Sequence, residues 1–268
     1  MTLKALRLIP LIVFAVACTT ANRAFADDPK PIKALMITGG PFHDYTTQKQ
    51  ALSEGISKRA NVEWTIYHEG DKGGTKFQLP IYNNPDWAKG YDVVVHNECF
   101  ADVVDEEFIK RVCKAHETVP GLFIHCCMHT FRAVKSTDEY RKMLGVTTVR
   151  HETARMLEIK PLNTSHPIMK GFPAAFETPV IDEAYVIEKV WPDCTPLATT
   201  FGVETQKNHP CIWVNQYGKS RIFGTTLGHP NEMIASEVFL DTVAKGLLWT
   251  CNKLDENGKP IAGYGPRN

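Results

Sequence analysis

The chain has 268 residues, of which 43% are hydrophobic and 22% charged, and its formal net charge at pH 7 is 0. This length and apolar content suffice for one large domain with a substantial core. There is no basic stripe, which argues against nucleic acid and against an anionic membrane surface as partners. Small neutral or polar molecules fit this composition better.

The first 26 residues are typical of a secretory signal peptide. Lys4 and Arg7 form a positive start, residues 8–17 form a short apolar run, and Ala24-Phe25-Ala26 is an A-x-A cleavage site. The apolar run is too short to form a stable membrane span. We therefore expect a periplasmic or secreted protein that begins at Asp27.

Cleavage after Ala26 would remove three basic residues and no acidic residue, so the formal charge would become −3. It would leave seven of the eight cysteines. An odd number in an exported protein means at least one free thiol or an intermolecular bond. Cys194 and Cys211 flank a hairpin-like region and are one candidate pair. A rival cleavage before Cys18, at a weak lipobox, would instead give a lipoprotein.

The first half of the chain alternates strands and helices. Strands are predicted at residues 33–38, 62–68, 91–96 and 121–126 from their apolar runs. Helices are predicted after Thr47, which with Gln50 resembles a capping box, over 105–116, and from about 129 to 144. A long loop at 69–84 lacks any regular period. This βαβ rhythm predicts an α/β fold with a doubly wound, mostly parallel sheet.

The second half has additional short strands separated by Pro and Gly. They are predicted at residues 156–159, 184–187, 197–200, 211–215 and 220–226, and a closing helix is predicted over 232–251. The expected organisation is a signal peptide (1–26), a lead-in (27–32), one domain (33–251) and a flexible tail (252–268).

Potential ligands and nucleophiles gather where two predicted strands end. In open α/β sheets, ligands bind beyond the carboxyl ends of the strands. The sequence therefore predicts an active site at this edge. The two clusters are His125-Cys126-Cys127-Met128-His129, after residues 121–124, and His96-Asn97-Glu98-Cys99, after residues 93–95.

An ordered set of motifs runs through most of the chain. It comprises Thr38-Gly39-Gly40 with Phe42-His43-Asp44, His96-Asn97-Glu98, residues 121–129 with Phe131-Arg132, Leu144-Gly145, His151, Ser165-His166-Pro167-Ile168, Asp182-Glu183-Ala184-Tyr185, and residues 217–223 leading to Thr226-Leu227-Gly228-His229. In this order the motifs resemble those of the ThuA-like (trehalose utilisation) family, over residues 33–251. The resemblance implies a flavodoxin-like sheet similar to that of class I glutamine amidotransferases. It also implies a carbohydrate partner, particularly trehalose or an oxidised (3-keto) sugar.

Histidines dominate the predicted site. Neutral imidazoles bind Zn²⁺ or a similar divalent metal, and Glu98 or Asp44 could complete such a shell. The alternatives are a metal-free pocket in which histidines act as acid and base, or histidines that are mostly structural. His116 is interpreted as a surface or packing residue. The candidate metal ligands are His125, His129, His151 and His229.

We expect acid–base chemistry through His96, Glu98, His129 and His229, with proton abstraction next to a keto group as the reaction. Glu98 could instead be a partner for a helix N-terminus. Glu183 could line the pocket or pair with Arg221. The expected substrate contacts are His43, Asp44, Asn97, Arg132, Glu183, Tyr185 and Trp87.

Two other functions stay open. Cys126 falls about where a glutamine amidotransferase carries its nucleophile, which would make the protein a thiol hydrolase. Against this, Ile124 and Met128 replace the usual elbow glycines, and no His-x-Glu pair follows. The other alternative is a non-catalytic sugar-binding module. No nucleotide-binding pattern is present, and the sequence does not decide the oligomeric state.

Overall fold

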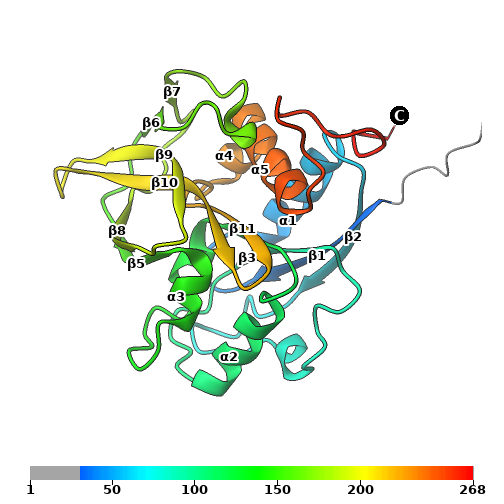
Figure 1. Cartoon of the computed structure of the whole chain (residues 1–268). Helices are drawn as coiled ribbons and strands as arrows, with labels where there is room; N and C mark the ends of the chain where they lie inside the picture. Colours follow the sequence, from blue (N-terminus) through cyan, green and yellow to red (C-terminus); the bar gives the residue numbers. More distant parts are fainter. Residues whose placement is uncertain (1–30, 268) are drawn as a thin grey trace, which may run out of the picture.

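The computed structural model describes residues 31–267 (Figure 1). The predicted signal peptide, the rival lipobox and most of the lead-in lie outside these residues. The described chain has an α/β fold built on one large mixed sheet, as the sequence predicts at the level of fold class. The strand order is β2-β1-β3-β4-β11-β10-β9-β6-β7, and β5 and β8 form a separate pair.

The bounds of the elements are as follows. The strands are β1 (Ile32–Gly39), β2 (Val62–His68), β3 (Val93–Glu98), β4 (Gly121–Ile124), β5 (Val146–His151), β6 (Glu158–Pro161), β7 (Phe176–Glu177), β8 (Tyr185–Val190), β9 (Thr195–Gly202), β10 (Lys207–Tyr217) and β11 (Ser220–Thr225). The helices are α1 (Tyr45–Ser57), α2 (Glu106–Ala115), α3 (Glu139–Leu144), α4 (Asn231–Ile234) and α5 (Glu237–Thr250), with short 3₁₀ helices η1 (Pro80–Asn83), η2 (His125–His129) and η3 (Pro167–Met169).

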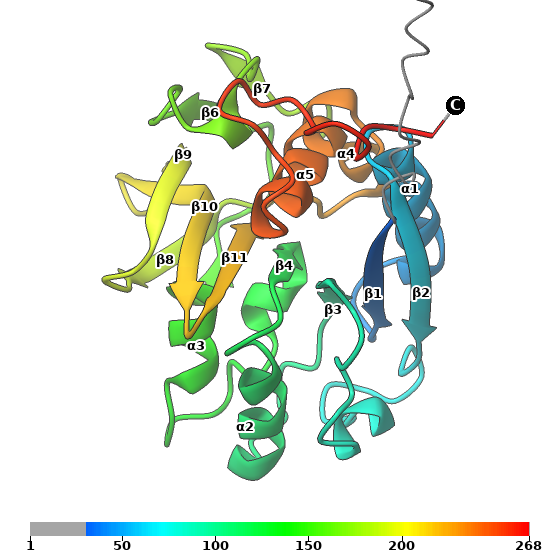
Figure 2. The ribbon, with the colours of Figure 1, turned by 45° about the vertical axis from the view of Figure 1, so that its right-hand side comes forward.

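The sheet is parallel at one end and antiparallel at the other. From β2 through β1, β3 and β4 to β11 every neighbouring pair is parallel, and Figure 2 shows these strands side by side. From β11 onward every pair is antiparallel. Because only two residues separate β10 from β11, that pair must be antiparallel. The mostly parallel sheet predicted for the whole domain therefore describes only this first part.

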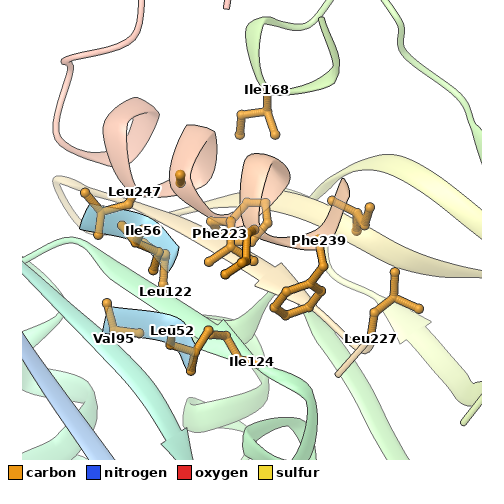
Figure 3. Packing of buried hydrophobic residues seen from close by; sticks show 14 of the residues in the cluster. Leu52, Ile56, Val95, Leu122, Ile124, Ile168, Phe223, Leu227, Phe239 and Leu247 are labelled. Carbon is orange, nitrogen blue, oxygen red and sulfur yellow. The ribbon is translucent and has the colours of Figure 1, made fainter. Parts of the chain in front are cut away.

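Helices pack against the two faces of the parallel end. Leu52 of α1 and Leu247 of α5 belong to one apolar core with Leu122 of β4, as seen in Figure 3. Phe108 of α2 and Met143 of α3 belong to a second core on the opposite face. Successive strand residues alternate between these cores, because side chains in a strand point to opposite faces.

Three predicted helix boundaries are wrong. Asp44, not Thr47, caps α1, because its Oδ1 accepts a hydrogen bond from the Thr47 amide at 3.1 Å. The helix predicted from about residue 129 is interrupted where Phe131 adopts a positive φ of 60°, so α3 begins only at Glu139. The closing helix is split into α4 and α5 by the extended backbone of Ser236.

The C-terminal tail packs on the domain, and the cysteines of the described chain are unpaired. The tail predicted to be flexible returns to the domain, where the Asn61 amide donates to the Tyr264 carbonyl at 3.0 Å and Tyr264 packs on the first core. The seven cysteines of residues 31–267 are free thiols, so Cys194 and Cys211 form no disulfide. Within the same residues, no helix has the length and apolar character needed to cross a membrane.

Candidate functional site

A cavity of about 150 Å³ lies at the carboxyl end of the parallel strands. A cavity of roughly this size in another protein holds one benzene molecule, so the space suits a single six-membered ring. The lining residues come from segments that follow β1, β3, β4 and β11 and from the β5–β8 pair. They are Phe42, His43, Cys99, Cys126, His129, Arg132, His151, Glu183, Tyr185 and His229.

His125 stands at the sharp turn that follows β4. Its φ of +48° is unusual for a residue other than glycine and turns the chain out of the strand. Its Nδ1 donates to the Thr226 carbonyl oxygen at 2.7 Å, which fixes Nδ1 as the protonated nitrogen. Nε2 therefore faces Glu183, whose Oε2 is 3.4 Å away. The elbow position that the sequence assigned approximately to Cys126 is taken by His125.

Glu183 is the common partner of three imidazoles. Besides His125, its carboxylate lies 3.3 Å from His229 Nδ1 and 3.4 Å from His151 Nε2. Burial alone would raise the pKa of Glu183, but contacts with His125 and His229 outweigh it and hold this pKa well below its usual range. Burial likewise opposes the charge on His125, yet Glu183 and Asp182 raise the pKa of His125 to about 9. The described site thus pairs an anionic carboxylate with a cationic imidazole.

The loop that carries His229 is fixed from two sides. The buried Asp182 accepts hydrogen bonds from the amides of Gly228 at 2.9 Å and His229 at 3.2 Å. The Gln48 side chain donates to the His229 carbonyl at 3.2 Å. Sequence reasoning missed Gln48, because a single polar residue on the inner face of a helix gives no signal of its target.

Tyr185 forms the aromatic wall of the cavity. Its ring stacks on His129, with centroids 4.1 Å apart and planes 6° from parallel, and it lies 5.9 Å from the His151 ring. Burial, with the nearby Arg132, lowers the pKa of His129 to about 2, so this ring is neutral at physiological pH. Arg132 also lines the cavity, and its Nη1 donates to the Val149 carbonyl at 3.3 Å.

Cys126 lies at the floor of the cavity in a small cluster with Cys99 and Tyr45. Burial by itself raises the pKa of the Cys126 thiol. Hydrogen bonds with Cys99 and His43, and the charge of His125, act against burial and hold that pKa well below its ordinary value. These contacts favour the thiolate form of a cysteine that the sequence offered as the alternative nucleophile.

His96 and Glu98 lie elsewhere, inside the second core. Together with His116 they form a chain of polar contacts. His96 Nδ1 is 2.7 Å from Glu98 Oε1, and His96 Nε2 is 2.9 Å from His116 Nε2. Tyr82 donates to Glu98 Oε1 at 2.8 Å and closes this network. The Glu98 side chain is 3% exposed, and neither it nor His96 lines the cavity.

Comparison with known proteins identifies the family of this chain. The ThuA family model, described as trehalose utilisation, matches residues 33–250. The chain belongs to the ThuA family. A ThuA-like protein from Parabacteroides merdae has 17% identity and a TM-score of 0.63, and the match covers 89% of this chain and 98% of that one. A second, from Bacteroides uniformis, has 14% identity and a TM-score of 0.62, and the match covers 88% and 97%.

The ThuA fold also resembles part of some larger enzymes. A β-galactosidase from Rahnella sp. R3 has 14% identity and a TM-score of 0.50, and the match covers 81% of this chain but 31% of the enzyme. At such identities the likeness shows the fold alone. The search of curated proteins gave no match.

The remaining predicted site residues of this ThuA protein have separate roles. Asp44 caps α1 and accepts from Asn231, and Asn97 donates to Gln48 inside the fold. Trp87 is buried against the His116 ring, 5.7 Å between centroids, away from the cavity. Arg221 stacks on Trp249 at 4.6 Å and so does not pair with Glu183. Phe42 and Cys99 also line the cavity; the sequence analysis named them within a motif and a cluster but gave neither a role.

Proposed function

We propose that this ThuA-family protein is an exported enzyme of carbohydrate breakdown that acts on a sugar or on an oxidised (3-keto) sugar. The observation that carries the proposal is the contact of Glu183 with three imidazoles on a cavity of one-ring size. The link of the family to trehalose utilisation supports a carbohydrate substrate. The N-terminal sequence supports export, and mass spectrometry of the exported protein should give the mass of a chain that begins at Asp27.

His151 is the general base in this proposal. Its Nδ1 donates to the Glu152 carbonyl at 2.9 Å, so a neutral His151 carries its lone pair on Nε2. That nitrogen lies 3.4 Å from Glu183 Oε1, and the side chain is 39% exposed at the cavity. When Nε2 takes a proton from the sugar, the new N–H lies within 3.4 Å of Glu183 Oε1, and the carboxylate charge stabilises the imidazolium that forms.

The reaction also needs a positive group, and His125 supplies one at the other oxygen of Glu183, Oε2. Removal of a proton from the carbon next to a keto group moves negative charge onto the keto oxygen. His229, which lines the cavity, can donate to that oxygen, and the charge of the neighbouring buried His125, whose pKa is about 9, adds to the positive potential there. The resulting enolate can be reprotonated, which gives isomerisation, or can expel a substituent, which gives elimination.

Turnover of a defined sugar tests this proposal. The full chain is incubated with trehalose and with 3-keto-trehalose, and products are followed by NMR. We expect His151→Gln to lower kcat by about 10²–10⁴-fold, the usual effect of losing a general base. The matched control is His166→Asn, outside the cavity, because Asn can still accept from the Ile168 amide that His166 caps.

Two results would contradict the assignment. Equal turnover by His151→Gln and wild-type protein would remove His151 as the base. Binding of the sugar without any conversion would favour the non-catalytic sugar-binding module.

A thiol hydrolase is the second candidate, and one observation favours it. Cys126 lines the cavity, and its pKa is held low by hydrogen bonds with Cys99 and His43 and by the charge of His125. A thiolate beside histidines is the arrangement that nucleophilic catalysis needs. We rank it second because His125, with its positive φ, occupies the turn directly after β4 where the fold would display a nucleophile.

A further inference from the structure

Three histidines from distant parts of the chain meet beside the cavity. One ring nitrogen from each of His43, His125 and His229 lies within 4.8 Å of the other two. The ring centroid of His43 is 4.9 Å from that of His125 and 5.0 Å from that of His229. All three pairs of rings meet edge to face, so no ring stacks on another.

Each of these histidines is held by the fold. His43 directly precedes Asp44, which caps α1 and accepts a 3.0 Å hydrogen bond from Asn231, the first residue of α4, two positions after His229. His125 is oriented by its bond to the Thr226 carbonyl. Such a bond from the second ring nitrogen is typical of metal-ligating histidines, since it leaves the first nitrogen free to bind the ion.

We propose that His43, His125 and His229 bind a divalent transition metal ion of the Zn²⁺ class, with an open coordination position toward the cavity. Three protein ligands and one open position are characteristic of catalytic zinc sites, whereas structural sites use four protein ligands. Imidazole nitrogen suits Zn²⁺, Co²⁺, Ni²⁺ and Cu²⁺ better than it suits Mg²⁺ or Ca²⁺.

The geometry needs only small movements to accept the ion. Zn–N bonds of about 2.1 Å in a tetrahedral site place the ligand nitrogens roughly 3.4 Å apart. The three nitrogens already lie within 4.8 Å of one another, so side-chain rotations that bring them together by up to about 1.4 Å complete the site. His229 Nδ1 is a buried atom without an aligned hydrogen-bond partner, although Glu183 lies 3.3 Å away.

This ligand set differs from the one expected from the sequence. His129 is stacked against Tyr185, and His151 contacts Glu183 Oε1 but contributes none of the three nitrogens that lie within 4.8 Å of one another. His43 takes their place. The proposal rests on the proposed function for its role: the metal supplies the positive centre at the keto oxygen, and it displaces the proton from His125, because a ligating imidazole must be neutral.

Metal binding can be measured without any enzyme assay. The full chain is stripped with a chelator, dialysed against Zn²⁺ or Co²⁺, and its metal content is determined by elemental analysis, with Co²⁺ absorption as a second readout. We expect about one ion per wild-type chain. His43→Gln and His229→Gln should weaken binding by at least about 100-fold, since loss of outer-shell partners alone costs about 10–100-fold. Thermal melting of each variant checks that it is folded.

His151→Gln is the matched control, because it changes a histidine of the same cavity outside the triad. It should keep the ion, with binding weakened by no more than about tenfold. The proposal is overturned if the folded wild-type chain binds neither ion, or if His151→Gln loses the ion as fully as His43→Gln. If His151→Gln is inactive and the wild-type chain binds no metal, the metal site is overturned and the proposed function stands. A bound ion without turnover of any sugar would overturn the proposed function alone.

Discussion

The fold contains two clusters of histidines around a glutamate, and they differ in almost every physical respect. Around Glu98, His96 and His116 are sealed in the second core, where Tyr82 and Cys127 provide the remaining hydrogen bonds. Around Glu183, His151 and His229 line a cavity and have side chains that are 38–39% exposed, whereas His125 is buried behind them. The same residue types thus form a closed polar network in one place and an accessible reactive site in the other.

Strand geometry explains why the first cluster is closed. β3 continues to Glu98, so His96 and Glu98 point to the same face as Val94, toward α2. The loop at 69–84 folds over that face and brings Tyr82 of η1 onto the Glu98 carboxylate. In contrast, β4 ends at Ile124, and the positive φ of His125 turns the chain out of the strand, so that Cys126 and His129 line the cavity. Reactivity here depends on whether a strand ends before or after its histidine.

Proton positions in the closed network sharpen this comparison. His116 Nδ1 donates to the Val119 carbonyl at 2.9 Å, so in neutral His116 the Nε2 atom accepts from His96 Nε2. Burial lowers the pKa of His116 to about 3, and the neighbouring His96 acts in the same direction. In the unfolded chain the same group titrates near pH 6.5. The unfolded state therefore binds the extra proton first as the pH falls.

The largest effect we predict concerns acid stability. Between about pH 6.5 and pH 3, His116 should remove about 1.4 kcal/mol of unfolding free energy for each unit by which the pH falls. His116→Gln should lose this contribution, so its stability should fall less steeply with acid even if it starts lower. Denaturant unfolding at several pH values measures the slope. An unchanged slope would mean that His116 is not kept neutral by the fold.

A smaller effect is expected at Cys126, on the cavity side. If its thiolate only supports the histidines, Cys126→Ala should keep turnover within about tenfold, a barrier change of about 1.4 kcal/mol. Cys211→Ala, a buried thiol of β10 outside the cavity, is the control for loss of a sulfur atom. A loss of several orders of magnitude in a folded Cys126 variant would establish the thiol hydrolase instead.

The sequence predicts the α/β class and most strands, because apolar runs and alternation report burial directly. It misplaces the ends of β3 and β4 by two residues each, and these two ends decide the site. Predicting β3 to end at His96 places Glu98 at the edge of the sheet, whereas the strand continues through it. The role of Glu183 also depends on partners far away in the sequence. The sequence analysis offered Arg221 as one ion-pair partner, whereas the fold places three histidines against the Glu183 carboxylate.

Turnover measured for Glu183→Gln and Glu98→Gln in the same assay tests the central claim most directly. Both changes remove one carboxylate charge from a histidine cluster and preserve side-chain shape. We predict that Glu183→Gln lowers kcat on 3-keto-trehalose by about 10²-fold or more in protein that is still folded at the assay temperature, even though loss of the His125 partner lowers its melting temperature. Glu98→Gln should lower the melting temperature while its folded fraction keeps kcat within about tenfold. The reverse result, a stable but inactive Glu98 variant and an active Glu183 variant, would contradict the account.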